Sequence, residues 1–98
     1  MAVKSASRSR QMAEFGGFLR TWRKASRLTA EIVAERAGIT RDTLRNLESG
    51  FGSVKLENVF AVLRALGLDA AVVAAVDPTL DDRGRALLQR GLPERVRS

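Results

Sequence analysis

The chain has 98 residues, which is enough for one small domain with tails. It is 45% hydrophobic and 29% charged, and this balance is typical of a globular protein and excludes a wholly disordered one. Seventeen Lys and Arg against eleven Asp and Glu give a formal net charge of +6, which favours an anionic partner, most commonly nucleic acid.

Cysteine and histidine are both absent. Their absence excludes disulfides, Cys/His zinc sites, cysteine nucleophiles and a histidine general base, so we expect no metal site. No paired-carboxylate or phosphate-loop pattern is present either, and the sequence therefore predicts neither an enzyme nor a cofactor. No apolar run approaches the roughly 18 residues of a membrane span. No apolar stretch follows the basic N-terminus, so the expectation is a cytoplasmic protein without a membrane partner.

The N-terminal part predicts a basic arm followed by a helix. Residues 1–11 lack periodicity and are expected to be flexible, and a solvated arm would look the same in sequence as one that grips phosphates. From Met12 onward, apolar side chains recur at positions i, i+3, i+4 and i+7, which predicts a helix with one inward stripe that includes Trp22 as a core residue. The stripe consists of Phe15, Phe18, Leu19 and Trp22, and the basic residues on the rest of the helix and at its end are Arg20, Arg23, Lys24 and Arg27.

Two helices joined by a tight glycine turn are predicted next. Thr29 is a plausible N-cap for the first, and Gly38 lies where the chain would leave that helix in a left-handed conformation. Thr40 can cap the second, which runs to about Glu48. Small or apolar residues occupy the positions where the two helices cross, as a helix-turn-helix requires. These residues are Val33, Ala34, Ala37, Ile39, Leu44 and Leu47.

A fourth helix is predicted after residues 49–52. Ser53 is its possible cap, apolar residues repeat at intervals of three and four from Leu56 to Leu66, and Gly67 ends it.

The period changes at residues 70–76, a short apolar run of three valines and four alanines. Its length and its valines favour a strand, although the alanines would suit a helix. A lone strand has no partner in its own chain, so we expect it to pair with the same strand of a second copy through Val72, Val73 and Val76. The alternative is that the run packs back on the helices.

The last segment contains a short helix and a basic tail. The sequence of residues 79–82 resembles a capping box, and the helix that follows is expected to end near Arg90 and Gly91. The tail could contact a partner protein, grip DNA or solubilise the chain. The expected organisation is an all-α domain of four to five helices at residues 12–68, preceded by the arm at 1–11 and followed by the strand and tail at 69–98.

The stretch LTAEIVAERAGITRDTLRNLESG, residues 28–50, resembles the helix-turn-helix of the Cro/XRE-type regulators. This lambda-repressor-like family includes the HipB-type antitoxins, and the resemblance covers about Phe15 to Gly67. It implies that Thr40–Glu48 is the recognition helix and that its outward side chains read base edges. Arginine can bond guanine, asparagine can pair with adenine, and aspartate can accept from cytosine. These outward side chains are Arg41, Asp42, Arg45 and Asn46. The alternative is that they form an ordinary solvent-exposed helix surface with no role in DNA binding.

The resemblance also implies a structural ion pair between Arg23 and Glu48, which would fix the first helix against the third. One departure is Ala30, where the family usually carries a glutamine that touches the DNA backbone. Four further residues are candidates for phosphate contact, two through hydroxyl groups at the start of the recognition helix and two in the loop that leads to the fourth helix. These are Thr40, Thr43, Ser53 and Lys55.

The leading functional expectation is a dimeric regulator, most simply a repressor, that binds double-stranded DNA at an inverted repeat. The alternative is the antitoxin of a toxin–antitoxin pair, which would bind a toxin protein and also its own operator. The resemblance to the HipB-type layout, with a strand that pairs across the dimer, supports this alternative.

Overall fold

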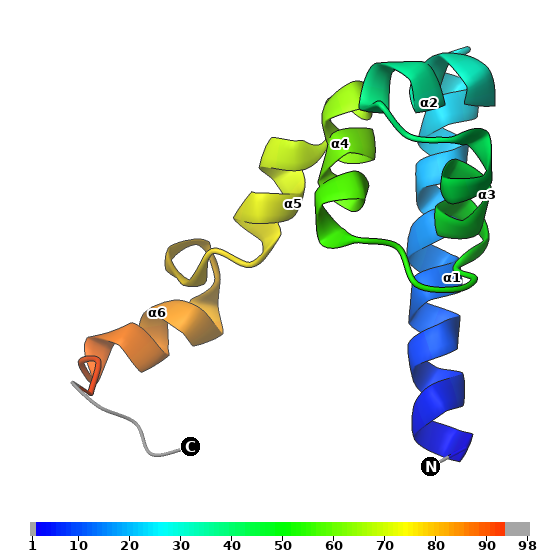
Figure 1. Ribbon diagram of the computed structural model, residues 1–98. Coiled ribbons are helices and arrows are strands. Elements are labelled where there is room, and N and C mark those ends of the chain that lie inside the picture. The colour runs from blue at the N-terminus through cyan, green and yellow to red at the C-terminus, as the bar shows by residue number, and fades with distance from the viewer. Residues whose placement is uncertain (1, 94–98) are drawn as a thin grey trace.

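The computed structural model describes residues 2–93, with side chains from Arg10 onward. This part of the chain contains six α-helices and one 3-10 helix (Figure 1). In chain order they are α1 (Ala2–Ala25), α2 (Ala30–Ala37), α3 (Arg41–Ser49), α4 (Leu56–Leu66), α5 (Asp69–Ala75), η1 (Pro78–Leu80) and α6 (Asp82–Gln89).

Helix α1 is longer than the sequence pattern suggested. It begins at Ala2, so the stretch expected to be a flexible arm is helical in the structure. Six of the ten residues at 2–11 are alanine, lysine, arginine or glutamine, which have high helix propensity, and no glycine or proline interrupts the stretch. The hydrophobic periodicity begins only near Met12, because it marks the part of a helix that packs on a core. It therefore does not predict a helix that continues past the core.

The caps of α2 and α3 lie where the sequence predicts them. The Thr29 hydroxyl accepts a hydrogen bond from the backbone N–H of Ile32 at 3.1 Å, and the Thr40 hydroxyl accepts one from Thr43 at 3.0 Å. Gly38 ends α2 with φ at +69°, a left-handed conformation that favours glycine. The backbone N–H of Ile39 then donates to the carbonyl of Ala34 at 3.0 Å, and this bond closes the turn between the two helices.

The fourth helix starts differently from the prediction. Lys55, and not Ser53, occupies the N-cap position of α4, and no side chain caps this end. Near the C-terminus, the Asp81 carboxylate caps α6 by accepting from the backbone N–H of Gly84, while Asp77 accepts from the N–H of Thr79 and caps η1.

The core lies among α1, α2, α3 and α4. Helix α1 packs on α3, and α2 packs on α4. Of the predicted inner residues, Val33, Ala34, Leu44 and Leu47 are buried, while Ala37 and Ile39 are partly buried and pack against them. Residues of α1 and α4 complete the cluster. Its members are Leu19, Val33, Ala34, Leu44, Leu47, Val62 and Leu63.

The predicted apolar stripe of α1 is only partly correct. Leu19 is buried, but Phe18 is 62% exposed and Trp22 is 52% exposed, so the prediction that Trp22 is a core residue is wrong. The side of α1 that meets α3 is formed instead by Gly16, Leu19 and Arg23, which recur at three and four residues. The aromatic side chains lie beside this contact and not within it.

The predicted strand at residues 70–76 is wrong, because residues 69–75 form α5 and residues 2–93 contain no strand. Two physical reasons favour the helix. Four alanines in seven positions have high helix propensity, and a single strand leaves its backbone groups unpaired. Of the three valines expected in a dimer strand, Val72 packs against the core, whereas Val73 and Val76 are exposed.

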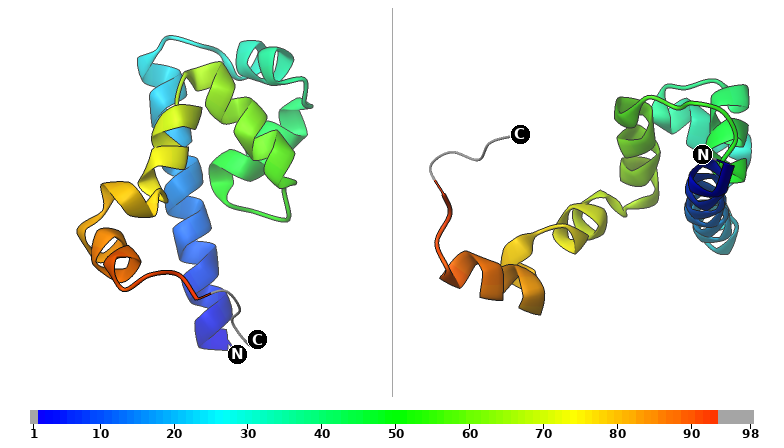
Figure 2. Two further views of the ribbon diagram at one scale, coloured as in Figure 1. Left: turned by 90° about the vertical axis from the view of Figure 1, so that its left-hand side faces the viewer. Right: turned by 90° about the horizontal axis from the view of Figure 1, so that it is seen from below.

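The C-terminal helices lead away from the bundle. Figure 1 and the right-hand view of Figure 2 show α5, η1 and α6 as an extension that stands clear of α1. None of the residues in these three elements is buried. Within residues 2–93 no single helix is long and apolar enough to cross a membrane. Helices α4 and α5 together have the required length and apolar composition, but they are bent by 120° relative to each other.

Candidate nucleic-acid interface

Helix α3 has one buried side and one exposed side. Leu44 and Leu47 point into the core, and the polar residues between them are exposed. The 3.6-residue period therefore brings the four predicted base-reading residues to the solvent side of one short helix. These residues are Arg41, Asp42, Arg45 and Asn46.

Two ion pairs hold the arginines of this surface. Arg41 Nη1 lies 3.6 Å from Glu31 Oε1 of α2, and Arg45 Nη2 lies 3.2 Å from Asp42 Oδ1. All four side chains are more than half exposed, so each pair contributes little to stability and is readily exchanged for another acceptor. Both guanidinium groups therefore remain available to an anionic or base-edge acceptor.

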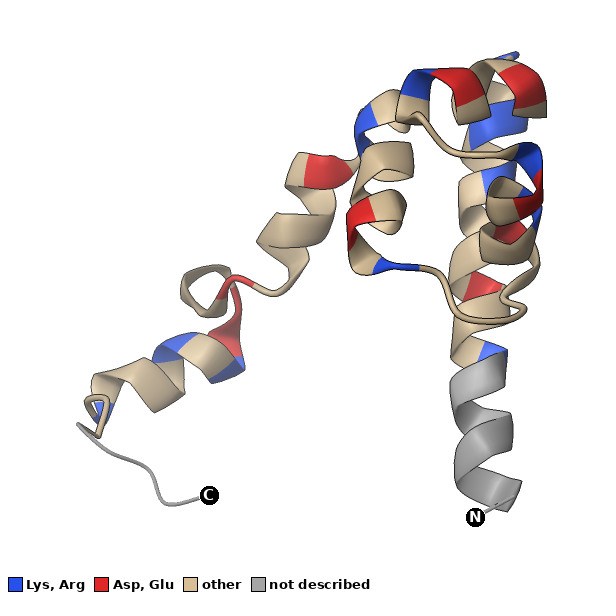
Figure 3. Cartoon of the chain, in the orientation of Figure 1, with Lys and Arg blue, Asp and Glu red and all other residues tan. Residues whose placement is uncertain are grey.

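A hollow of about 290 Å³ adjoins this surface, between α1, the start of α2 and α3. Arg20 of α1 lines it together with Arg41 and Arg45 of α3, and Ala30 forms part of its wall. The short Ala30 side chain leaves space beside the arginines. Figure 3 shows the Lys and Arg positions on the upper part of α1 and on α3.

Arg20 is a residue that the sequence analysis did not place at the site. The signal was present, because Arg20 precedes Arg23 by three residues and so lies on the same side of α1. Because Arg23 was assigned to an ion pair with α3, its neighbour on that side had to lie close to α3 as well.

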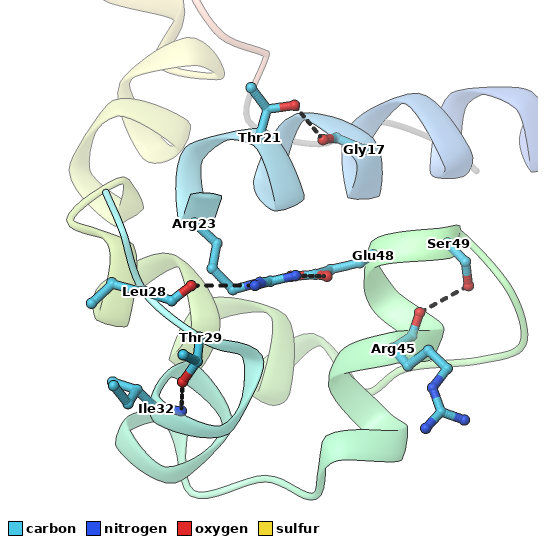
Figure 4. Close-up of polar contacts among 9 residues, drawn as sticks. All are labelled: Gly17, Thr21, Arg23, Leu28, Thr29, Ile32, Arg45, Glu48 and Ser49. Atoms are coloured by element: carbon cyan, nitrogen blue, oxygen red, sulfur yellow. Dashed lines mark hydrogen bonds and ion pairs between the residues drawn. The ribbon is translucent and has the colours of Figure 1, made fainter. Parts of the chain in front are cut away.

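Arg23 and Glu48 form a two-pronged ion pair across α1 and α3 (Figure 4). Nε donates to one carboxylate oxygen at 2.8 Å, and Nη2 donates to the other at 2.9 Å. The third guanidinium nitrogen, Nη1, donates to the carbonyl of Leu28 at 3.2 Å. The two side chains are only 11% and 9% exposed. The hydrogen bonds that Arg23 donates to Glu48 raise the pKa of Arg23, so this cation is committed to the fold and is not free to contact DNA.

The four phosphate-contact candidates lie in two groups. Thr40 and Thr43 are at the start of α3, where their hydroxyl oxygens are 2.9 Å apart. Ser53 and Lys55 are exposed in the loop between α3 and α4, which follows the other end of α3. The structure therefore does not bring all four together but places one pair near each end of the helix that carries the base-reading candidates.

Replacing Thr40 with alanine is expected to destabilise the protein by about 1 kcal/mol, because the N–H of Thr43 loses its acceptor at the start of α3. Thr40→Ser keeps a hydroxyl and should retain most of that stability. Thermal or urea unfolding of the two variants measures the difference. Equal stabilities for alanine and serine would show that the hydroxyl does not act as a cap.

The fold and this surface define a class of protein. A glycine turn joins α2 to α3, and the second helix exposes arginine, asparagine and aspartate side chains. The model of a helix-turn-helix domain family matches residues 14–76, more than half of the chain, and the chain belongs to this family. No curated protein and no solved structure gives a significant match. Membership of this family indicates a DNA-binding regulator.

Proposed function

We propose that this protein is a sequence-specific regulator of the Cro/XRE type, which binds double-stranded DNA by inserting α3 into the major groove. The observation that carries the proposal is the exposed side of α3, the second helix of the helix-turn-helix. It combines two arginines, an asparagine and an aspartate on a helix whose other side is buried in the core. A helix of this kind presents its N-terminal residues to base edges.

Each side chain of α3 has a separate role in this proposal. Arg41 and Arg45 exchange their surface ion pairs for the O6 and N7 atoms of guanine, and Asn46 pairs with adenine. Asp42 accepts from cytosine or orients Arg45, with which it already pairs at 3.2 Å. The hydroxyl and ammonium groups near the two ends of α3, together with Arg20, hold the phosphate backbone and fix the register of the helix in the groove.

We further propose that the regulator binds an inverted repeat as a dimer. It would repress transcription by occupying the operator. One half-site extends over only a few base pairs, and two linked recognition helices about one DNA turn apart multiply the specificity. An antitoxin would use the same DNA surface and would differ by a second surface for its toxin.

Selection from a random DNA pool at about 0.15 M salt tests the proposal, because salt at this level suppresses non-specific backbone binding. An enriched inverted repeat is the expected result. Arg45→Ala is then expected to weaken binding by about 1–3 kcal/mol and to relax the preference at one base position. Arg20→Ala should instead weaken all sequences similarly and reduce the salt slope by about 1.

Arg64→Ala is the matched control, since Arg64 is exposed on α4, outside the residues assigned to the interface. It removes the same charge and should leave sequence preference unchanged. If no sequence is enriched, or if Arg64→Ala affects the preference as much as Arg45→Ala, α3 is not the reading element.

A further inference from the structure

Helix α1 carries an exposed aromatic surface that its own bundle does not cover. Phe18 and Trp22 are one helical turn apart and are 62% and 52% exposed, and Phe15 lies at the edge of the same side. We refer to these three residues as the aromatic strip. Large aromatic side chains contribute much of the energy of protein interfaces, and an exposed group of them marks a contact surface.

The C-terminal helices form a second uncovered apolar surface. Val76 is 80% exposed and Leu87 is 50% exposed. Both line a hollow of about 490 Å³ together with Pro78, the carboxylates of Asp77 and Asp81, and Arg83. Helices as short as α5 and α6, with seven and eight residues, are marginal in water unless their apolar side packs against something. We refer to residues 69–92 as the C-terminal arm, and its own elements leave it without a core.

The two surfaces carry opposite charge. Residues 10–27 of the α1 region contain five basic residues and one acidic residue, whereas the arm contains four acidic residues, all within residues 69–82, and three arginines, all within residues 83–92. Figure 3 shows the Lys and Arg positions on the upper part of α1, and the Asp positions between α5 and the start of α6, where Arg positions follow them. Thr79 donates two hydrogen bonds to Asp77, from its hydroxyl and its backbone N–H, and these hold the pKa of that carboxyl below its usual range. The basic region around the aromatic strip is therefore electrostatically complementary to the acidic segment of the arm, residues 69–82.

Within one chain the arm does not reach the aromatic strip. The right-hand view of Figure 2 shows the arm pointing away from α1. The first helix of the arm, α5, packs on α4, and α6 packs on η1. A second copy carries both surfaces, so one contact between an arm and a strip can be repeated by a two-fold axis. At roughly 200 Å² for a whole aromatic side chain, the exposed parts of the strip and a similar area on the arm would bury on the order of 1,000 Å² in the two copies together. An interface of this size is at the low end of the range for specific complexes and suits a dimer that dissociates on dilution.

We propose that two copies of this chain exchange their C-terminal arms, so that the hollow beside Val76 and Leu87 in one copy receives Trp22 of the other. The inference deepens the proposed function, because it assigns an interface to the dimer that the inverted repeat requires. The contact itself does not depend on DNA and is tested without it.

Trp22 is the sole tryptophan of the chain and therefore reports directly on the contact. Analytical ultracentrifugation is expected to show a dimer that dissociates on dilution. The tryptophan emission should move to longer wavelength over the same concentration range, because the indole becomes exposed to water. A monomer at every concentration, or an emission spectrum that does not change as the dimer dissociates, would overturn the proposal.

Val76→Asp is expected to raise the dissociation constant of the dimer about tenfold or more, because it places a charge in the apolar contact. Leu56→Asp is the matched control, since Leu56 is 70% exposed but lies at the start of α4, outside both surfaces. Far-UV circular dichroism shows whether each variant keeps its helices. Equal dissociation constants for Val76→Asp and the wild type would show that the arm is not part of the interface.

Cysteine cross-linking identifies which surfaces meet, because the natural chain contains no cysteine. A Trp22→Cys protein is mixed with a Val76→Cys protein and oxidised. The mixed disulfide is expected in excess over both disulfides between identical chains, because the proposed contact joins the strip of one copy to the arm of the other. A dimer that yields no excess of the mixed disulfide uses a different surface, and the proposal fails.

These outcomes are separable from the proposed function. A protein that dimerises and cross-links as described but enriches no DNA sequence overturns the DNA-reading proposal alone. A protein that enriches a DNA sequence as a monomer overturns the arm exchange alone.

Discussion

Replacing Gly16 with alanine is expected to lower the free energy of unfolding by about 3 kcal/mol. A Cβ at this position would collide with the carbonyl oxygen of Leu47 and would lie 2.7 Å from that of Glu48. Both obstacles are backbone atoms of α3 and cannot rotate away, so α1 and α3 would have to separate. The substitution also displaces the C-terminal end of the helix assigned to base reading, and DNA affinity should fall with stability.

The neighbouring glycine provides a matched control. Gly17 lies in the same helix, and an added Cβ there would meet no atom within 4 Å. Gly17→Ala should therefore stabilise α1 by up to about 1 kcal/mol through helix propensity alone. Urea unfolding gives the free energy of unfolding of each variant, and so compares the effect of one added methyl group at two adjacent positions. If Gly16→Ala is as stable as Gly17→Ala, the helices do not approach each other as closely as the structure shows.

The contrast between these glycines shows where sequence reasoning succeeds and where it does not. Local rules identified Thr29, Gly38 and Thr40, because a cap or a left-handed turn depends on residues within one helical turn. The same rules do not distinguish Gly16 from Gly17, because each glycine simply lowers helix propensity. The role of Gly16 depends on a helix thirty residues further along the chain, and no local pattern contains that information.

The same limit explains two of the incorrect predictions, the core position of Trp22 and the strand at residues 70–76. The apolar period of α1 identified a helix but not which neighbours would cover it, so Trp22 was assigned to a core that receives Leu19 instead. In residues 70–76 the valines and alanines gave conflicting preferences, and periodicity does not distinguish a short apolar helix from a strand. The exposed side of α3 was predictable because a helix with leucines on one side must present its remaining residues to solvent.

Removing one partner of the Arg23–Glu48 pair is expected to destabilise the protein by about 3 kcal/mol, which is the second large effect. Glu48→Leu leaves a guanidinium that is only 11% exposed with the Leu28 carbonyl as its remaining partner. The double variant Arg23→Met and Glu48→Leu removes the charge as well and should recover most of the loss, because a buried ion pair and an apolar pair of similar volume have similar stability.

A double-mutant cycle measured by urea unfolding tests this coupling, and Glu31→Gln is its control. Glu31 pairs with Arg41 at 3.6 Å, but its side chain is 74% exposed, so its loss should change stability by less than about 1 kcal/mol. The raised pKa of Arg23 sets the expected pH dependence. A cation with a raised pKa stabilises the fold below its unfolded pKa, and this stabilisation is lost only as the pH rises through the folded value. Both values lie far above neutral pH, so the coupling should be equal at neutral and mildly alkaline pH. Additive effects of the two single substitutions would show that the pair does not fix α1 against α3.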